Sequence, residues 1–176
     1  MTTDKPVSLQ QYAMRYGTFL GIFWIVKFTF LPLGFTIPLL QMLFVLLTCF
    51  VPILGYIYAR KFRNIGCEGA VGFRKAFTFT FFMYMFASIL TAAGHYIYFR
   101  FIDGGYLANM YLEQLNALKS STTGELAASM DQLVTAFNTI SSLSPLELTF
   151  QLMSQNIFYG IVLSLPTALF VMRKKK

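Results

Sequence analysis

Four long stretches of the chain consist almost entirely of apolar residues and are separated by connections of very different length. They run from about residue 16 to 34, 37 to 59, 76 to 99 and 148 to 172. A helix needs about 20 apolar residues to cross a hydrocarbon core of about 30 Å. Because lipid offers no hydrogen bonds, each stretch must satisfy its own backbone groups. The pattern predicts an all-α, four-helix transmembrane bundle, with residues 1–176 forming one integral membrane domain.

Turn and cap residues mark the ends of these stretches. Pro32 and Pro38 bracket a tight turn between the first two, and residues 103–105 (Asp-Gly-Gly) end the third. Ser144, Pro145 and Glu147 supply an N-cap, a first-turn proline and a capping-box acid, which predict the start of the fourth helix.

The long connection between the third and fourth stretches, residues 104–143, has its own pattern. Apolar residues recur at helical spacing from Tyr106 to Leu118 and again from Leu126 to Ile140. A capping box from Thr122 to Glu125 is expected to open the second run. The pattern predicts two amphipathic helices, which either cap the bundle, lie on the membrane surface or bind a partner.

The charges lie at the ends of the apolar stretches and differ between the two sides. Eleven of the 14 Lys and Arg residues, with only Asp4 and Glu68 among the acids, fall on the side of both termini. The other side holds Arg100 and Lys119 against five acids. The positive-inside rule therefore places both termini in the cytoplasm. This distribution does not favour nucleic acid as a partner, although the net charge is +7.

Composition agrees with lipid as the main solvent and gives little support to catalysis. The chain is 56% hydrophobic and 12% charged, whereas soluble domains are about 25% charged. Cys49 and Cys67 are expected to stay unpaired, and no metal-ligand spacing or cofactor motif is present. No nucleophile–base set and no carboxylate pair falls within a stretch, so no catalytic residue and no enzyme activity are predicted.

Four polar residues near the apolar stretches are candidates for a ligand site. Lys27 lies inside the first stretch, where a lysine costs about 2.5–3.5 kcal/mol. It either binds an anionic group or extends its amine toward the outer interface. His95, the only histidine, either titrates near neutral pH or bonds to a neighbouring helix. Arg100 and Asp103 are three residues apart and are expected to pair on one helix face.

Two further sets concern packing and lipid. Gly17 and Gly21 have the spacing that lets helix backbones approach, within the bundle or in another protein. Seven basic residues at the ends of the stretches either contact anionic lipid, at about 1 kcal/mol per charge, or only set the topology. They are Arg60, Lys61, Arg63, Arg74, Lys75, Arg173 and Lys174.

Several of these segments together resemble a known family. They are Gly69 to Phe77 at the start of the third stretch, Tyr96 to Asp103 at its end, the glycine pair and the lysine-rich end. The family is a domain of unknown function with four spans, found mainly in Bacteroidota, and the resemblance covers nearly the whole chain. It implies a bacterial inner-membrane location and no established activity. It also implies a candidate partner, a membrane glycosyltransferase that uses polyprenyl phosphate.

Three functions remain open from the sequence. The first is a non-enzymatic accessory or scaffold subunit of an inner-membrane complex, in contact with lipids and with another membrane protein or a second copy. The second is a small oligomeric transporter or channel that uses Lys27 and His95. The third is a lipid-modifying membrane enzyme with His95, Arg100 and Asp103 at its outer surface.

Overall fold

The computed structural model describes residues 8–173 and is helical along almost this whole length. Within that range, the only β-type pairing is one antiparallel bridge between Val71 and Arg173. The predicted all-α fold, with two helices in the outer connection, is confirmed. Its elements are α1 (Leu9–Gly34), α2 (Pro38–Lys61), a π-helical turn η1 (Phe62–Gly66), α3 (Phe73–Phe101), α4 (Tyr106–Ser120), α5 (Glu125–Ser141) and α6 (Pro145–Val171).

Four of these elements correspond to the apolar stretches of the sequence. The helices α1, α3, α6 and the continuous segment formed by α2 and η1 are long and apolar enough to cross a membrane. The shortest, α2, has 24 residues, which at 1.5 Å per residue is about 36 Å. Each helix can therefore span a hydrocarbon core of about 30 Å.

Capping boxes explain where two of the spanning helices begin. The Gln11 amide donates to the Ser8 hydroxyl at 3.3 Å, and the Ser8 amide donates to Gln11 Oε1 at 2.8 Å. This box starts α1 at Leu9, earlier than the apolar pattern alone indicates, because capping is a polar signal outside the span. The predicted box of α6 is present as well, with Ser144 N donating to Glu147 Oε2 at 2.9 Å and Glu147 N to Ser144 Oγ at 3.3 Å.

The turn predicted between Pro32 and Pro38 is present but shorter than expected, because α1 continues through Pro32 to Gly34 and α2 begins at Pro38. The N-cap predicted for α5 is wrong. The N-cap of α5 is Gly124 and not Thr122, from which the capping box was expected to start. Gly124 has a φ of 69°, which glycine adopts readily, while the Thr122 hydroxyl donates to the Lys119 carbonyl at 3.0 Å.

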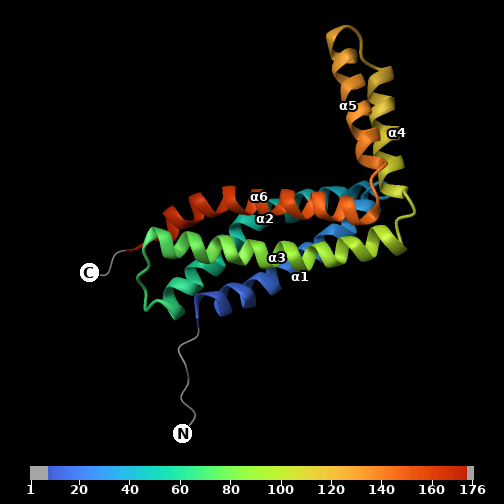
Figure 1. Ribbon diagram of the computed structural model, residues 1–176. Helices are drawn as coiled ribbons and strands as arrows, with labels where there is room; N and C mark the ends of the chain where they lie inside the picture. Colours follow the sequence, from blue (N-terminus) through green and yellow to red (C-terminus); the bar gives the residue numbers. More distant parts are fainter. Residues whose placement is uncertain (1–7, 174–176) are drawn as a thin grey trace. The chain divides into compact units, whose positions relative to one another are not determined.

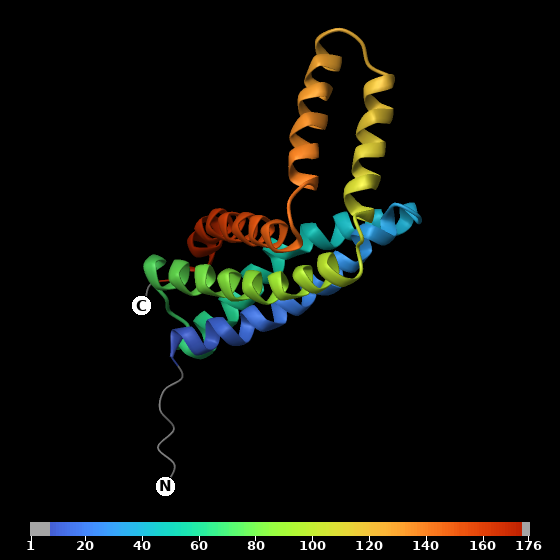
Figure 2. The same cartoon turned by 45° about the vertical axis from the view of Figure 1, so that its right-hand side comes forward.

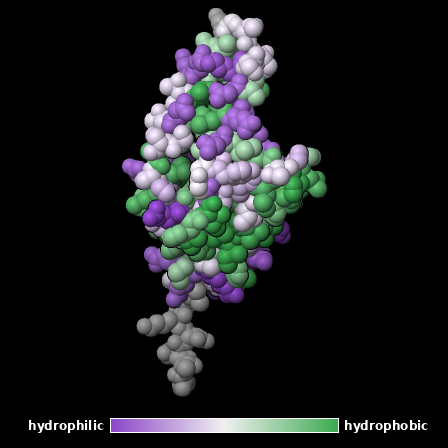
Figure 3. Space-filling model, turned by 90° about the vertical axis from the view of Figure 1, so that its right-hand side faces the viewer, coloured by the Kyte–Doolittle hydropathy of each residue, from purple (hydrophilic) through white to green (hydrophobic). Residues whose placement is uncertain are grey.

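The chain divides into two compact units, which we describe separately. The first comprises residues 1–92 and 152–176, and the second residues 93–151. In the first unit, α1, α2 and most of α3 and α6 lie side by side (Figures 1 and 2). In the second, α4 and α5 form a helical hairpin (Figures 1 and 2). Hydrophobic residues gather over the long helices on the face shown in Figure 3, whereas hydrophilic residues are scattered over the hairpin.

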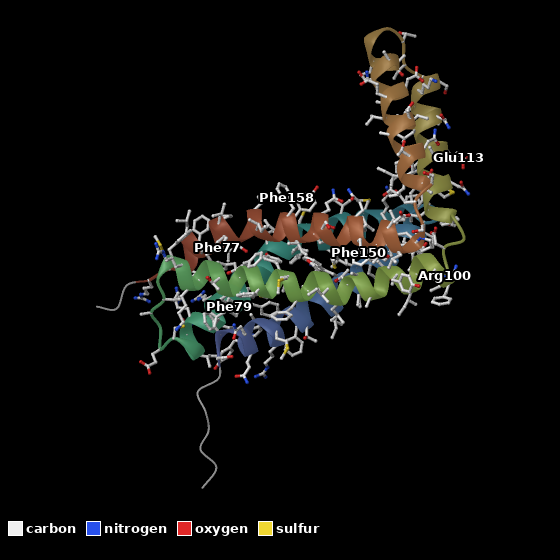
Figure 4. The ribbon with its side chains drawn as sticks, viewed as in Figure 1. Phe77, Phe79, Arg100, Glu113, Phe150 and Phe158 are labelled. Carbon is white, nitrogen blue, oxygen red and sulfur yellow. The ribbon has the colours of Figure 1, made fainter. Side chains whose placement is uncertain are left out.

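The helix α3 forms the centre of the bundle. Over an apolar segment of 18 residues in each span, 44% of the residues are buried in α3 and 17% in the span that contains α2. The exposed residues of α2 are nevertheless largely apolar, so this helix presents its apolar surface outward, as a lipid-facing helix does. Phe158 of α6 likewise points away from α3 (Figure 4) and is largely exposed.

Aromatic rings pack the end of the bundle where α1 begins and α2 ends. Phe62 and Phe79 are stacked with centroids 4.1 Å apart and planes within 5°. Tyr16 of α1 stacks on Tyr58 of α2 at 5.1 Å and meets Phe79 edge-on at 6.2 Å. Such pairs add about 0.5–1.5 kcal/mol each beyond area burial, so this layer holds α1, α2, η1 and α3 together.

Buried hydroxyl groups in the spans are satisfied locally. Thr80, Ser88 and Ser164 each donate to the carbonyl four residues earlier, at 2.8, 2.8 and 2.6 Å. Thr91 of α3 instead reaches the Gly21 carbonyl of α1 at 3.4 Å. Hydroxyls bonded in this way can be buried without an unsatisfied polar group.

Candidate functional site

The Lys27 amine lies over aromatic rings of the first unit. It is 6.0 Å from the centroid of the Trp24 ring, one turn earlier on α1, and 5.2 Å from that of Phe44 on α2. An ammonium over a ring face is attracted by the ring quadrupole, by about 0.5–2 kcal/mol depending on its desolvation. Among the described side chains no carboxylate is paired with Lys27, so its positive charge is met by rings.

Tyr84 is the point at which all four spanning helices meet. Its side chain is 0% exposed, and its ring stacks on Trp24 of α1 with centroids 6.1 Å apart. Gly55 of α2 lies against the Tyr84 hydroxyl, and Gly160 of α6 lies against its Cβ. Any side chain at either glycine would collide with the tyrosine, so both positions require glycine for this close approach.

Two polar atoms at this junction have no hydrogen-bond partner among the described residues. They are the Tyr84 hydroxyl and the Trp24 indole nitrogen, and both side chains are buried. An unsatisfied polar group in an apolar interior costs about 1–3 kcal/mol in mutational data. The apolar pattern of the sequence did not predict this junction. The only signal was the coincidence of a central tyrosine with a single glycine in each of two other spans.

The glycine pair of α1 lies against α3. A Cβ at Gly17 would be 2.7 Å from the Met83 carbonyl oxygen, and one at Gly21 would be 3.1 Å from that of Ala87. Both glycines are buried. Their lack of a side chain therefore lets the backbones of α1 and α3 approach closely inside the bundle.

His95, Arg100 and Asp103 belong to the second unit. His95 is 6% exposed, and its ring lies 6.2 Å from that of Phe99. Arg100 is exposed at the end of α3 and points away from that helix (Figure 4). Lys27 lies in the other unit.

The pair expected between Arg100 and Asp103 does not form. The helix α3 ends at Phe101, so Asp103 is no longer on its face. The two carboxylate oxygens of Asp103 accept from the amides of Gly105 at 3.0 Å and Leu107 at 3.1 Å. The role of this acid is therefore to satisfy free N–H groups at the start of α4.

The basic residues at the other end of the spans fall into two groups. Arg63 donates to the Val171 carbonyl at 3.1 Å and so caps the C-terminus of α6, while the Lys75 amine lies 6.0 Å from the Phe62 ring. Arg60, Lys61, Arg74 and Arg173 are exposed and free to meet anionic groups, and Lys174 lies outside the described residues.

Sites for other chemistry are few in the part of the chain that the structure covers. No group of three or more His, Cys, Asp or Glu residues there is placed to hold a metal ion. Cys49 and Cys67 are both free thiols.

The four long apolar helices, the glycine contacts between them and the cationic ends define a multi-pass helical membrane protein. The chain belongs to the family described as "protein of unknown function (DUF4199)", whose model matches residues 15–173. Comparison with curated proteins and with solved structures gives no match.

Proposed function

We propose that this protein is a non-enzymatic accessory or scaffold subunit of a bacterial inner-membrane complex, and that the hairpin of α4 and α5 binds the partner subunit. The bundle would anchor the hairpin with both chain termini in the cytoplasm. On the resemblance described above, a membrane glycosyltransferase that uses polyprenyl phosphate is the first partner to test.

The internal packing of the hairpin uses only part of its surface. Tyr111 of α4 and Phe137 of α5 are in ring contact with centroids 5.6 Å apart, and this burial raises the pKa of the Tyr111 hydroxyl. Lys119 and Asp131 form an ion pair near the turn. Glu113 points away from α5 (Figure 4), so the outer face of α4 is polar at this position.

One face of α5 is apolar and exposed, and this observation carries the proposal. Leu126, Leu133 and Ile140 are spaced by seven residues and are 57%, 50% and 41% exposed. A seven-residue repeat brings side chains to nearly the same side of a helix, where apolar residues form the seam against a second helix. We name these three residues the α5 stripe and expect a helix of the partner to pack on it.

The surroundings of Lys27 give the transporter hypothesis less support. A lysine that lines an aqueous path would expose its amine to water, whereas this amine lies over the rings of Trp24 and Phe44. The lipid-modifying hypothesis uses Asp103 at the outer surface, and its carboxylate is engaged by two backbone amides.

Affinity purification in mild detergent, followed by identification of the proteins retained, tests the proposal. Leu133→Glu places a charge on the α5 stripe, and Gln132→Glu places the same charge on the neighbouring exposed position. We expect wild type and Gln132→Glu to retain the same membrane protein and Leu133→Glu to lose it. Retention by Leu133→Glu, or turnover of a substrate by the purified chain alone, contradicts the proposal.

A second measurement separates a protein partner from the membrane surface. A fluorophore on Leu133→Cys, in a chain with Cys49 and Cys67 replaced by serine, is compared in vesicles with and without spin-labelled lipid. We expect no quenching, because the proposal places the stripe away from the bilayer, where it is available to a protein partner. Strong quenching would assign the stripe to the bilayer surface and overturn the proposed role.

A further inference from the structure

An apolar groove lies between α2 and α6, within the first unit. Its volume is about 280 Å³, and its lining is almost wholly apolar. Pro52 and Pro166 face it from the two helices. The short ring of a proline fills less space than a branched or aromatic side chain. The other main lining residues are Ile53 and Tyr56 of α2 and Leu163 and Phe170 of α6.

The size of the groove suits one flexible chain better than a protein element. One water molecule occupies about 30 Å³ in the liquid, and a methylene group is of similar size. The groove therefore holds on the order of nine methylene groups. Both helices that form it are candidate membrane spans, so the molecules that surround it are lipids. Ile53 is 50% exposed and Phe170 is 76% exposed, which leaves the rim accessible from the bilayer.

Exposed cationic residues follow the groove at the C-terminal end of each helix. Arg60 comes four residues after Tyr56, which is about 6 Å along α2, and Arg173 comes three residues after Phe170. The backbone of Arg173 is fixed by two hydrogen bonds to Val71, at 2.9 and 3.0 Å. An apolar groove that is followed along each helix by an exposed arginine is complementary to a molecule with an apolar tail and an anionic head.

We infer that this groove binds one acyl chain of an anionic phospholipid, with its phosphate held by Arg60 and Arg173. The guanidinium fork suits phosphate oxygens, and juxtamembrane cations attract anionic lipid. The site is distinct from the α5 stripe and does not depend on the proposed function. Arg63 is not part of it, because its guanidinium caps α6.

Native mass spectrometry of the detergent-purified full chain tests this site with phosphatidylglycerol and phosphatidylcholine. The wild-type chain is expected to retain more phosphatidylglycerol than phosphatidylcholine. Arg60→Gln with Arg173→Gln is expected to lower that retention by about thirtyfold, from about 1 kcal/mol per charge. Arg15→Gln, an exposed arginine of α1 outside the groove lining, is the control and is expected to bind as wild type.

The groove itself is tested by filling it. Ile53→Trp places a large ring in the groove, while Leu46→Trp adds the same ring seven residues earlier on α2, at a position of similar exposure that is not in the lining. We expect Ile53→Trp to lose phosphatidylglycerol and Leu46→Trp to keep it. Equal retention of the two lipids by wild type, or wild-type retention by Ile53→Trp, overturns the inference.

A measurement on the unaltered chain keeps the inference testable if a variant folds poorly. Phosphatidylglycerol with a photoreactive acyl chain is expected to crosslink to the segments 52–56 and 163–170. Crosslinks spread evenly over the exposed surfaces of all four spans would show general lipid contact only and would overturn the site.

Discussion

The contact between Tyr84 and Gly55 yields a quantitative prediction about the stability of the bundle. Tyr84→Phe removes a buried hydroxyl that has no hydrogen-bond partner among the described residues. A buried unsatisfied group costs about 1–3 kcal/mol. We therefore expect Tyr84→Phe to leave the free energy of unfolding unchanged or to raise it by about 1 kcal/mol.

Gly55→Ala has the opposite effect in the wild-type background. The added Cβ would collide with the Tyr84 hydroxyl, and overpacking costs about 1–3 kcal/mol. Alanine recovers up to about 1 kcal/mol of this through its helix preference. In the Tyr84→Phe background the hydroxyl is gone, and the nearest ring atom lies 3.0 Å from the same Cβ position. The two substitutions should therefore couple by at least about 1 kcal/mol.

Gly160→Ala is the matched control for this cycle. Its Cβ would lie 2.6 Å from the Cβ of Tyr84, an atom that phenylalanine shares, so Tyr84→Phe cannot relieve the collision. The assay is the free energy of unfolding in detergent, measured for all single and double variants. Additivity of Tyr84→Phe with Gly55→Ala, within the usual 0.3–0.5 kcal/mol, would refute the reasoning. So would a loss of more than 1 kcal/mol in Tyr84→Phe alone.

Three other substitutions have expected outcomes. Gly17→Ala should lower the thermal midpoint in detergent, because its Cβ would be 2.7 Å from the Met83 carbonyl oxygen. Gly72→Ala, whose Cβ would have nothing within 4 Å, should leave the midpoint unchanged, and equal shifts would contradict the close packing of α1 on α3. Ser144→Ala removes the N-cap of α6 and should cost about 1 kcal/mol of unfolding free energy, and an unchanged value would show that the cap is dispensable. Wild type and Lys27→Ala should both show no ion flux in liposomes, and flux that depends on Lys27 would favour a channel.

The spans and the outer helices were predictable because each rests on a local pattern. An apolar run of about 20 residues has few alternatives in a membrane protein, and helical spacing identified both helices of the hairpin. The capping box of Ser144 and Glu147 was also read correctly, since its residue types and spacing are specific.

The interior of the bundle was not predictable because it depends on contacts between spans. Tyr84 appears in the sequence as one aromatic residue among many. Its position at the junction follows from Gly55 and Gly160 on two other helices, which no periodicity connects to it. Asp103 was misjudged for a related reason, because the end of α3 at Phe101 removes it from the helix face shared with Arg100.

We expect the chain to span a membrane four times, with its basic segments on one side and its hairpin on the other. A membrane-impermeant maleimide applied to intact cells or sealed vesicles tests it directly. Two versions of the chain are compared, and both carry Cys49→Ser. The first keeps Cys67, which follows η1. In the second, Cys67 is replaced by serine and Ser120→Cys places the thiol at the hairpin tip. We expect the Ser120→Cys version to be labelled from outside and Cys67 to be labelled only after permeabilisation. Labelling of both thiols from the same side would contradict it.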